Sequence, residues 1–157
     1  MKFVSTLCAT ALALAGTAPA SAQTFSPVGQ AVFEGAVVVQ KGLTLNCKLK
    51  LTINVMDANT AWATPALESP NILCPTMTFG FTPYQVTFGN GIVTINYVRM
   101  NPITPGTCSG NIVGTWGGNF GRRSIVVNAN LPDAGLSDPC KITGNLFQVS
   151  GSDLSLN

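Results

Sequence analysis

Between positions 43 and 55 the chain alternates strictly between apolar and polar residues. The odd-numbered positions hold Leu, Ile, Val or Cys, and the even-numbered positions hold Thr, Asn or Lys. Side chains of a β-strand point alternately to its two faces, so this pattern predicts a half-buried strand with its odd-numbered residues inward. Cys47 lies on the apolar side of the pattern, and we therefore expect its disulfide at the core.

Shorter apolar stretches on both sides of this segment predict further strands. Residues 31–40 precede it and are separated from it by Lys41-Gly42, which predicts a hairpin. Asn90-Gly91 predicts a second hairpin, because both residues favour the positive φ angles of a type I′ turn. The other predicted strands are residues 77–81, 84–88, 92–98, 108–116, 124–131 and 140–149, with a short last strand at 153–156.

Residues 57–75 interrupt the pattern with turn-forming residues, among them Asn59, Pro65 and Pro70. We expect a long irregular connection here. Long loops in compact domains often carry function, so Trp62 is the candidate exposed residue of a binding loop. The structural alternative is that this segment folds back, with Trp62 and Leu67 covering the open end of the sandwich.

No segment keeps a helical period for three turns, and 16 Gly and 10 Pro punctuate the chain at about the spacing of strands. These features predict an all-β fold. We expect a two-sheet antiparallel β-sandwich of about eight strands, disulfide-bonded.

The first 22 residues have the pattern of a secretory signal peptide. A basic start at Met1-Lys2 precedes an apolar run over residues 3–16 and the small-residue site Ala20-Ser21-Ala22. We expect cleavage between Ala22 and Gln23, which leaves residues 23–157 as one domain. The apolar run is too short to span a membrane, and we expect no transmembrane segment in the mature chain. The predicted location is secreted, periplasmic or cell-surface.

Four cysteines remain after the leader, and in an exported chain an even number predicts disulfides. Three pairings are possible, of which we favour the sequential one. A structural zinc site is less suitable, because the cysteines are far apart in sequence and the chain has no His. The cysteines are Cys47, Cys74, Cys108 and Cys140, with Cys47 paired to Cys74 and Cys108 to Cys140 in the favoured arrangement.

Charge is scarce and nearly balanced. Lys2 lies in the leader, so seven basic and six acidic residues remain. Binding to nucleic acid requires clustered Lys and Arg that neutralise many phosphates, and the largest cluster, Arg122-Arg123, is more typical of a solvated turn. We expect no nucleic-acid partner.

No set of residues predicts catalysis. Without His the usual base of a nucleophilic serine is missing, and Ser109 and Ser124 lie in turn-like contexts. The carboxylate pairs nearest in sequence are Asp57 with Glu68 and Asp133 with Asp138, and both pairs occur in turn-rich segments. We predict a non-enzymatic protein with no cofactor, catalytic residue or metal site.

The other aromatic residues are more typical of a core, although they also suit a platform for sugars or hydrocarbon. Tyr97 shares its alternation with Val93 and Ile95, which predicts an inward ring. Trp116 adjoins Gly117-Gly118, and we expect its ring to cover the end of a sheet.

Four short motifs carry a resemblance to a known family. They are Phe25-Ser26-Pro27, Asn46-Cys47, Thr107-Cys108-Ser109-Gly110 with Gly114-Thr115-Trp116, and Pro139-Cys140-Lys141-Ile142-Thr143-Gly144. With the leader, they make the chain similar to the PraB-type alkane oxidation activators, small exported bacterial proteins. The resemblance implies a non-enzymatic extracellular factor that promotes growth on alkanes by aiding contact with, or uptake of, hydrocarbon. Hydrocarbon or the cell surface is then the expected partner.

Two other functions remain open from the sequence. A pilin-like subunit would assemble by β-strand addition, with residues 23–40 completing the sheet of a neighbour, and would therefore associate with itself. A β-sandwich that binds carbohydrate or another small ligand is the other alternative.

Overall fold

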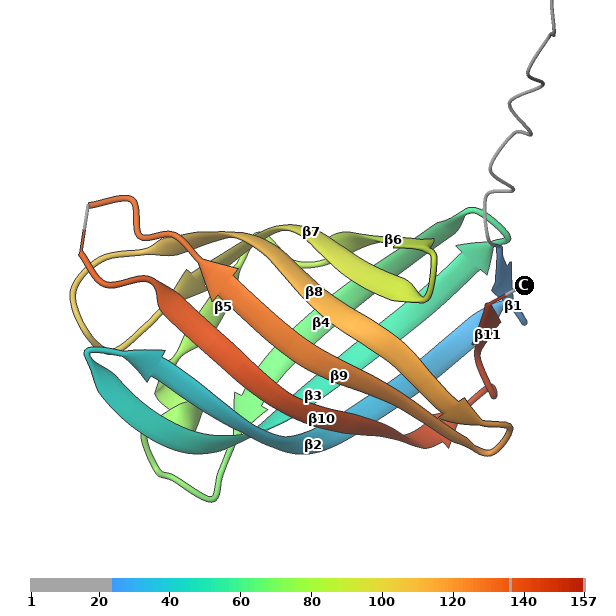
Figure 1. Ribbon diagram of the computed structural model, residues 1–157, viewed down its shortest axis with the longest axis horizontal. Coiled ribbons are helices and arrows are strands. Elements are labelled where there is room, and N and C mark those ends of the chain that lie inside the picture. Colours follow the sequence, from blue (N-terminus) through green and yellow to red (C-terminus); the bar gives the residue numbers. More distant parts are fainter. Residues whose placement is uncertain (1–23, 136, 157) are drawn as a thin grey trace, which may run out of the picture.

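The computed structural model describes residues 24–135 and 137–156 of the chain (Figure 1). The predicted signal peptide, residues 1–22, and the cleavage site at Ala22 and Gln23 lie outside the described residues. The signal peptide therefore stays a prediction.

The described residues form strands, with one short 3-10 helix, η1. Figure 1 shows their arrangement. The elements are β1 (Phe25–Ser26), β2 (Gly29–Lys41), β3 (Leu43–Asp57), β4 (Thr60–Glu68), η1 (Cys74–Thr76), β5 (Thr78–Gly80), β6 (Tyr84–Gly89), β7 (Ile92–Asn101), β8 (Cys108–Asn119), β9 (Arg122–Leu131), β10 (Cys140–Gly151) and β11 (Ser155–Leu156). Within this part of the chain, no helix is long and apolar enough to cross a membrane.

Eight of the strands close into a barrel. In chain order, β2, β3, β4, β6, β7, β8, β9 and β10 each pair antiparallel with the next, and β10 returns to pair with β2. The prediction of an all-β, disulfide-bonded fold is confirmed, but the prediction of a two-sheet sandwich is wrong. Alternation of apolar and polar residues shows only that a strand has one buried face. Strands of a sandwich and of a barrel both have one, so the pattern does not distinguish the two folds. Pairing between the first and last barrel strands distinguishes the two, and it removes both sheet edges.

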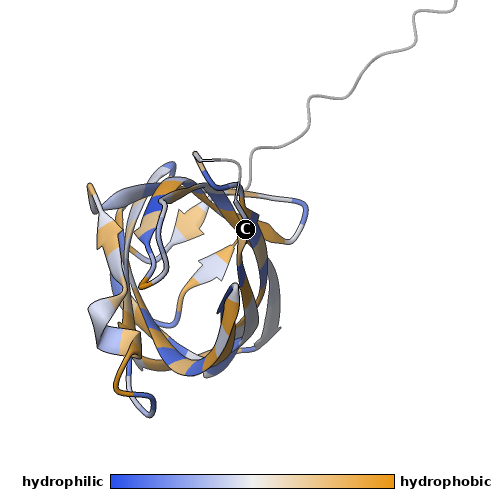
Figure 2. Ribbon diagram, turned by 90° about the vertical axis from the view of Figure 1, so that its left-hand side faces the viewer, coloured by the Kyte–Doolittle hydropathy of each residue, from blue (hydrophilic) through white to orange (hydrophobic). Residues whose placement is uncertain are grey.

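The barrel interior is packed with side chains, as expected for a barrel of eight strands. Strand β3 follows the predicted alternation: from Leu45 to Val55 its odd-numbered residues are buried, and only Leu43 at the start is exposed. Figure 2 looks along the barrel and shows apolar and polar residues alternating around its wall. The largest fully buried side chains include Phe33, Leu49, Leu51, Ile53, Met100, Ile125, Leu131, Ile142 and Leu146.

Both predicted hairpins are confirmed. Gly42 joins β2 to β3 with φ 65°, a conformation that glycine adopts without strain. Asn90 and Gly91 join β6 to β7 with φ 53° and 74°, the pair of positive angles that a type I′ turn needs.

The predicted irregular stretch at 57–75 is wrong in its first half, because β4 occupies residues 60–68. Its Ala61, Ala63, Pro65 and Leu67 are buried and alternate with exposed or half-buried residues. Small alanines and a proline gave too weak an apolar signal for a strand. Pro65 is tolerated because β4 pairs with β6 only over Ala61–Ala63, which leaves the following residues at a free edge on that side.

The barrel wall is interrupted where β4, β5, β6 and β7 meet. Both β5 and β6 pair with β7, and residues 81–83 separate them. No registered pairs join β4 to β5 among the described residues. We call β4, β5, β6 and β7 the broken wall, and β3, β2, β10 and β9 the regular wall.

A β-bulge in β7 overturns the prediction for Tyr97. The register with β8 shifts between Ile95 and Val98, and Tyr97 adopts a positive φ of 55°. The extra residue puts Val98 in the core and leaves Tyr97 83% exposed. Simple alternation from Val93 and Ile95 cannot anticipate a bulge, because an inserted residue reverses the faces beyond it.

The two barrel ends are closed differently. Both termini of the described chain lie at one end, where β1 pairs with β11 and the buried Phe25 and Leu154 cover the core (Figure 1). At the other end Cys108 is bonded to Cys140, and Lys41 pairs with Asp133.

Candidate functional site

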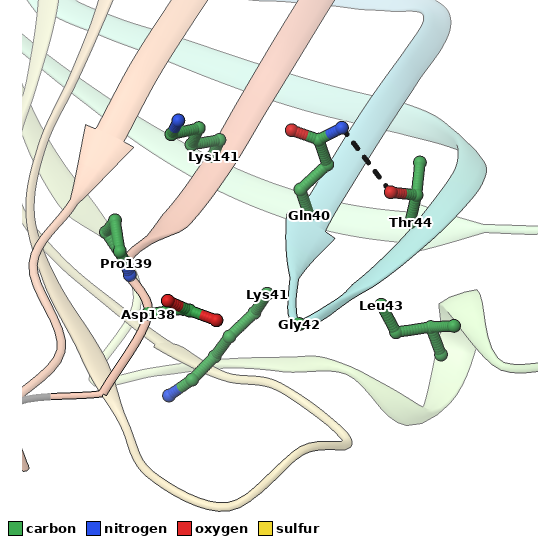
Figure 3. Close-up of a pocket in the computed structure, with 8 residues that line it drawn as sticks. All are labelled: Gln40, Lys41, Gly42, Leu43, Thr44, Asp138, Pro139 and Lys141. Atoms are coloured by element: carbon green, nitrogen blue, oxygen red, sulfur yellow. Dashed lines mark hydrogen bonds between the residues drawn. The ribbon is translucent and has the colours of Figure 1, made fainter.

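A polar pocket opens at the second end of the barrel, beside the β2–β3 turn (Figure 3). The turn supplies one side and the start of β10, with the residues before it, supplies the other. The side chain of Gln40 donates a hydrogen bond to Thr44 across the turn (3.4 Å). The lining residues are Gln40, Lys41, Gly42, Leu43, Thr44, Asp138, Pro139 and Lys141.

The Lys41 side chain carries the buried charge at this end. Its ammonium group lies 2.5 Å from a carboxylate oxygen of Asp133, and the two side chains are 5% and 1% exposed. Asp133 also accepts hydrogen bonds from the backbone N–H groups of Gly135 and Ser137 and from the Ser137 hydroxyl. Lys41, and after it Ser137, hold the pKa of Asp133 well below its usual range. Asp133 is therefore ionised at neutral pH, and its carboxylate is engaged by the Lys41 side chain.

A glycine makes this ion pair possible. Gly106 has φ 105°, and a Cβ at this position would lie 2.6 Å from the Lys41 nitrogen. The Thr104 hydroxyl donates to the Lys41 carbonyl (3.3 Å) and ties the same loop to β2. The arrangement fastens a loop over the barrel end, and it offers no free acid or base for catalysis.

The carboxylates considered for catalysis are not brought together as free pairs. Asp57 and Glu68 lie at opposite ends of the β3–β4 hairpin, since Asp57 is opposite Thr60 and Glu68 is opposite Lys48. The Asn59 N–H lowers the pKa of Asp57, as in an ordinary turn. Asp133 is engaged by Lys41, whereas Asp138 lines the pocket. Within the described residues, no group of three or more His, Cys, Asp or Glu is placed to hold a metal ion.

Ser109 and Ser124 take part in strands. Ser109 lies opposite Arg99 on β7, and its N–H donates to the Pro132 carbonyl (2.9 Å). Ser124 lies opposite Phe147 on β10. Arg122 is exposed at the start of β9, whereas Arg123 pairs with Asp153 at 3.3 Å.

Both disulfides join the cysteines in the sequential order favoured from the sequence. Cys47, inward on β3, is bonded to Cys74 in η1, and Cys108 at the start of β8 is bonded to Cys140 at the start of β10. All four residues are buried. The first bond ties η1 to β3 of the regular wall, next to β4, and the second ties β8 to β10 beside the Lys41–Asp133 pair.

The two tryptophans have different surroundings. Trp62 lies on β4 between Asn54 and Gln85 rather than in a loop, and it is 37% exposed on the outer face. Trp116 packs edge-on against the rings of Phe33 (5.7 Å) and Phe88 (6.1 Å). Trp116 is therefore part of the packing against the core and does not cover a sheet end.

Several exposed aromatic residues were missed from the sequence. Phe81 and Phe120 are 81% and 84% exposed, and Phe147 is half exposed on the outside of β10. The exposure of Phe120 could have been predicted from the sequence, because an aromatic residue at the tip of the turn between β8 and β9 cannot reach the core. The exposure of Phe81 could not have been predicted, because its outward position depends on the break between β5 and β6.

A family model described as alkane oxidation protein activator PraA/PraB-like matches residues 1–155 of the chain. The comparison with curated proteins and the comparison with solved structures found no match.

Proposed function

Because the chain belongs to the PraA/PraB-like family of alkane oxidation protein activators, we propose that it is an exported, non-catalytic factor that promotes bacterial growth on alkanes. The family match carries this proposal. The leader pattern at residues 1–22 supports export, and the two disulfides suit an oxidising compartment outside the cytoplasm.

The placement of apolar side chains supports a role in surface contact. The barrel interior is filled by its own residues, so contact with hydrocarbon or with the cell surface has to use the outside. Trp62 on β4 is the residue we propose for this contact, and Phe81, Phe120 and Phe147 are further exposed aromatic side chains of the barrel. Such exposed apolar groups mark interaction sites when they gather.

A growth experiment tests the proposal. Purified mature protein, residues 23–157, is added to a strain lacking the gene, with an alkane as the only carbon source. We expect a shorter growth lag on the alkane and unchanged growth on a soluble carbon source. An unchanged lag on the alkane would refute the proposed function.

Paired variants locate the contact. Trp62→Ala should weaken the effect on growth more than Arg122→Ala, which changes an exposed residue of a different kind. Equal effects of the two variants would place the contact elsewhere.

The pilin-like alternative is not favoured by the pairing of β2. This strand pairs with β3 over thirteen consecutive positions and with β10 on its other side, so residues 29–41 complete their own barrel. A deletion strain that grows normally on alkane but loses surface filaments would nevertheless support that alternative.

Processing is tested separately. We expect the exported protein to begin at Gln23 and to carry both disulfides, which intact mass and N-terminal sequencing of the shed protein measure. A retained leader would contradict this part of the proposal.

A further inference from the structure

Three exposed aromatic residues gather on the outside of the broken wall. We call Trp62, Phe81 and Tyr97 the aromatic patch. Trp62 on β4 lies opposite Gln85 on β6, and the side chain of Asn96 on β7 donates to the Gln85 carbonyl (3.3 Å). Tyr97 follows Asn96 in the chain. Trp62 and Tyr97 are thus on neighbouring strands, which lie about 5 Å apart from one to the next. Phe81, in the link between β5 and β6, has its ring against Arg99, two residues after Tyr97 on β7.

Two of the three rings are held outward by unusual backbone. Phe81 and Tyr97 have φ angles of 63° and 55°, which large side chains adopt only at a cost. Among the described residues, Asn90 alone joins them as a non-glycine residue with positive φ, and it lies in the hairpin turn. Such strain is found where the surrounding structure enforces it, and it often marks a functional position.

Side-chain contacts fix both strained residues. The Tyr97 N–H donates to the side-chain oxygen of Asn111 on β8 (3.0 Å). The Arg99 guanidinium group lies over the Phe81 ring, 5.4 Å from its centre. Both rings nevertheless remain more than 80% exposed, so these contacts hold the residues while leaving the rings available.

The surroundings of the rings indicate the chemistry of a ligand. Gln85 and Asn111 are exposed amides beside the patch, and Arg99 adds donors. A liquid hydrocarbon that covered the rings would also remove water from these groups without replacing their hydrogen bonds, which is costly. A sugar offers C–H groups to the electron-rich ring faces and hydroxyl groups to the amides.

We propose that the aromatic patch binds polysaccharide at the bacterial cell surface. The inference deepens the proposed function, because it assigns the cell surface rather than hydrocarbon to this face of the barrel. It does not require that the protein promotes growth on alkanes.

Binding to cells tests the inference. Fluorescently labelled protein, residues 23–157 with both disulfides formed, is mixed with washed cells of the deletion strain. Half of the cells are first treated with periodate, which cleaves the vicinal diols of sugars. We expect periodate to lower binding about tenfold or more, because the cleaved sugar rings no longer match the aromatic and amide groups of the patch. Absent binding to untreated cells, or equal binding to both samples, would overturn the inference.

Variants assign the binding to the patch. The double variant Phe81→Asn/Tyr97→Asn removes both rings but keeps a residue type that tolerates positive φ, and it should bind untreated cells about tenfold more weakly. Tyr97→Phe keeps one ring and should restore part of the binding when it replaces Tyr97→Asn in that background. Phe120→Ala removes an equally exposed ring at the β8–β9 turn and should leave binding unchanged. A loss with Phe120→Ala as large as that of the double variant would contradict the assignment, provided that melting temperatures show all variants folded.

A further experiment with hydrocarbon distinguishes polysaccharide from hydrocarbon as the ligand of the patch. The same proteins are mixed with hexadecane droplets in buffer. If the double variant loses adhesion to droplets and keeps binding to cells, the patch is a hydrocarbon surface and the inference is wrong. If binding to cells follows the patch while added protein leaves growth on alkane unchanged, the inference stands and the proposed function fails.

Discussion

The regular wall and the broken wall of this barrel are held together by different kinds of interaction. In the regular wall β2 and β3 pair over thirteen consecutive positions, and β9 and β10 pair without a register shift. In the broken wall β4 and β6 share three pairs, and β7 is bulged. Backbone pairing is nearly continuous in the regular wall, where β2 and β10 have one register shift between Gln148 and Ser150, whereas side chains bridge the gaps of the broken wall.

Tyr84 is the side chain that repairs the break between β5 and β6. Its buried hydroxyl accepts the Arg99 N–H (3.2 Å) and lies within hydrogen-bond distance of the Gly80 carbonyl and of the Arg99 carbonyl (3.0 Å). These backbone groups lie where the regular pairing stops. Burial raises the pKa of the Tyr84 hydroxyl, which stays protonated and able to donate. Buried backbone groups need hydrogen-bond partners, and at the break the Tyr84 hydroxyl supplies them. The barrel can therefore tolerate an irregular segment there, with Phe81 turned outward.

The largest expected effect comes from a charge inside the regular wall. Leu49→Asp or Ile53→Asp puts an unpaired carboxylate into the packed interior and should cost about 4 kcal/mol or more, enough to unfold a domain of ordinary stability. Thr52→Asp, on the outer face of the same strand, should cost less than about 1 kcal/mol. Urea denaturation of the purified proteins measures the contrast, and similar midpoints for all three would contradict the assigned faces.

The two disulfides tie different parts of the barrel, since Cys47–Cys74 joins β3 to η1 and Cys108–Cys140 joins β8 to β10. The loops they close differ little in length, with separations of 27 and 32 residues, so removing either bond by a pair of Cys→Ala changes should cost about 3.5 kcal/mol in the chain-entropy model. The local effects should differ. Without the Cys47–Cys74 bond, η1 is released from β3, and residues 69–83 should become sensitive to protease while the protein is still folded. Equal resistance of residues 69–83 to protease in both variants would show that the Cys47–Cys74 bond does not hold this segment in place.

The Lys41–Asp133 pair fastens one end of the regular wall, and it should be sensitive to acid. The pKa of Asp133 is lowered by folding, so its contribution is complete above the ordinary Asp pKa of about 3.9 and is lost as the pH falls through the lower value in the folded protein. Asp133→Asn should lower the melting temperature at pH 7, and this difference from the native protein should shrink below about pH 4.

The matched control for this prediction removes both charges. Lys41→Met/Asp133→Leu leaves no unpaired buried charge and should be milder than Asp133→Asn alone. A constant difference in melting temperature between pH 7 and pH 3 for Asp133→Asn would refute the electrostatic account.

The smallest expected effect is at the break itself. Tyr84→Phe keeps the buried ring and removes the hydroxyl, which leaves the Arg99 N–H without its partner and should cost about 1–2 kcal/mol. Hydrogen exchange of the Arg99 amide should accelerate, while amides of β2 and β3 stay protected. Uniform acceleration over both walls would mean that the hydroxyl has no local role.

Much of the regular wall was predictable, because its residues repeat one local rule. The alternation from Leu45 to Val55 and the turn at Gly42 each depend on neighbours in sequence, as does the Asn90-Gly91 hairpin of the broken wall, and each is present in the structure. Trp62 was expected to be exposed and is so, although on a strand. The aromatic patch as a whole was not predictable, since Phe81 and Tyr97 face outward only because of a break and a bulge in paired strands.

The sequence by itself determined the strand segments of the regular wall, the inward face of β3 and the all-β class, because side-chain alternation follows directly from the geometry of an extended chain. Only the tertiary structure decided that β10 returns to β2 and closes a barrel, that β4 is a strand despite Pro65, and that Tyr97 lies outside. These outcomes depend on pairing between residues far apart in the chain. A closed sheet gains hydrogen bonds at both former edges. This gain depends on the whole sheet and cannot be predicted from the sequence of any single strand.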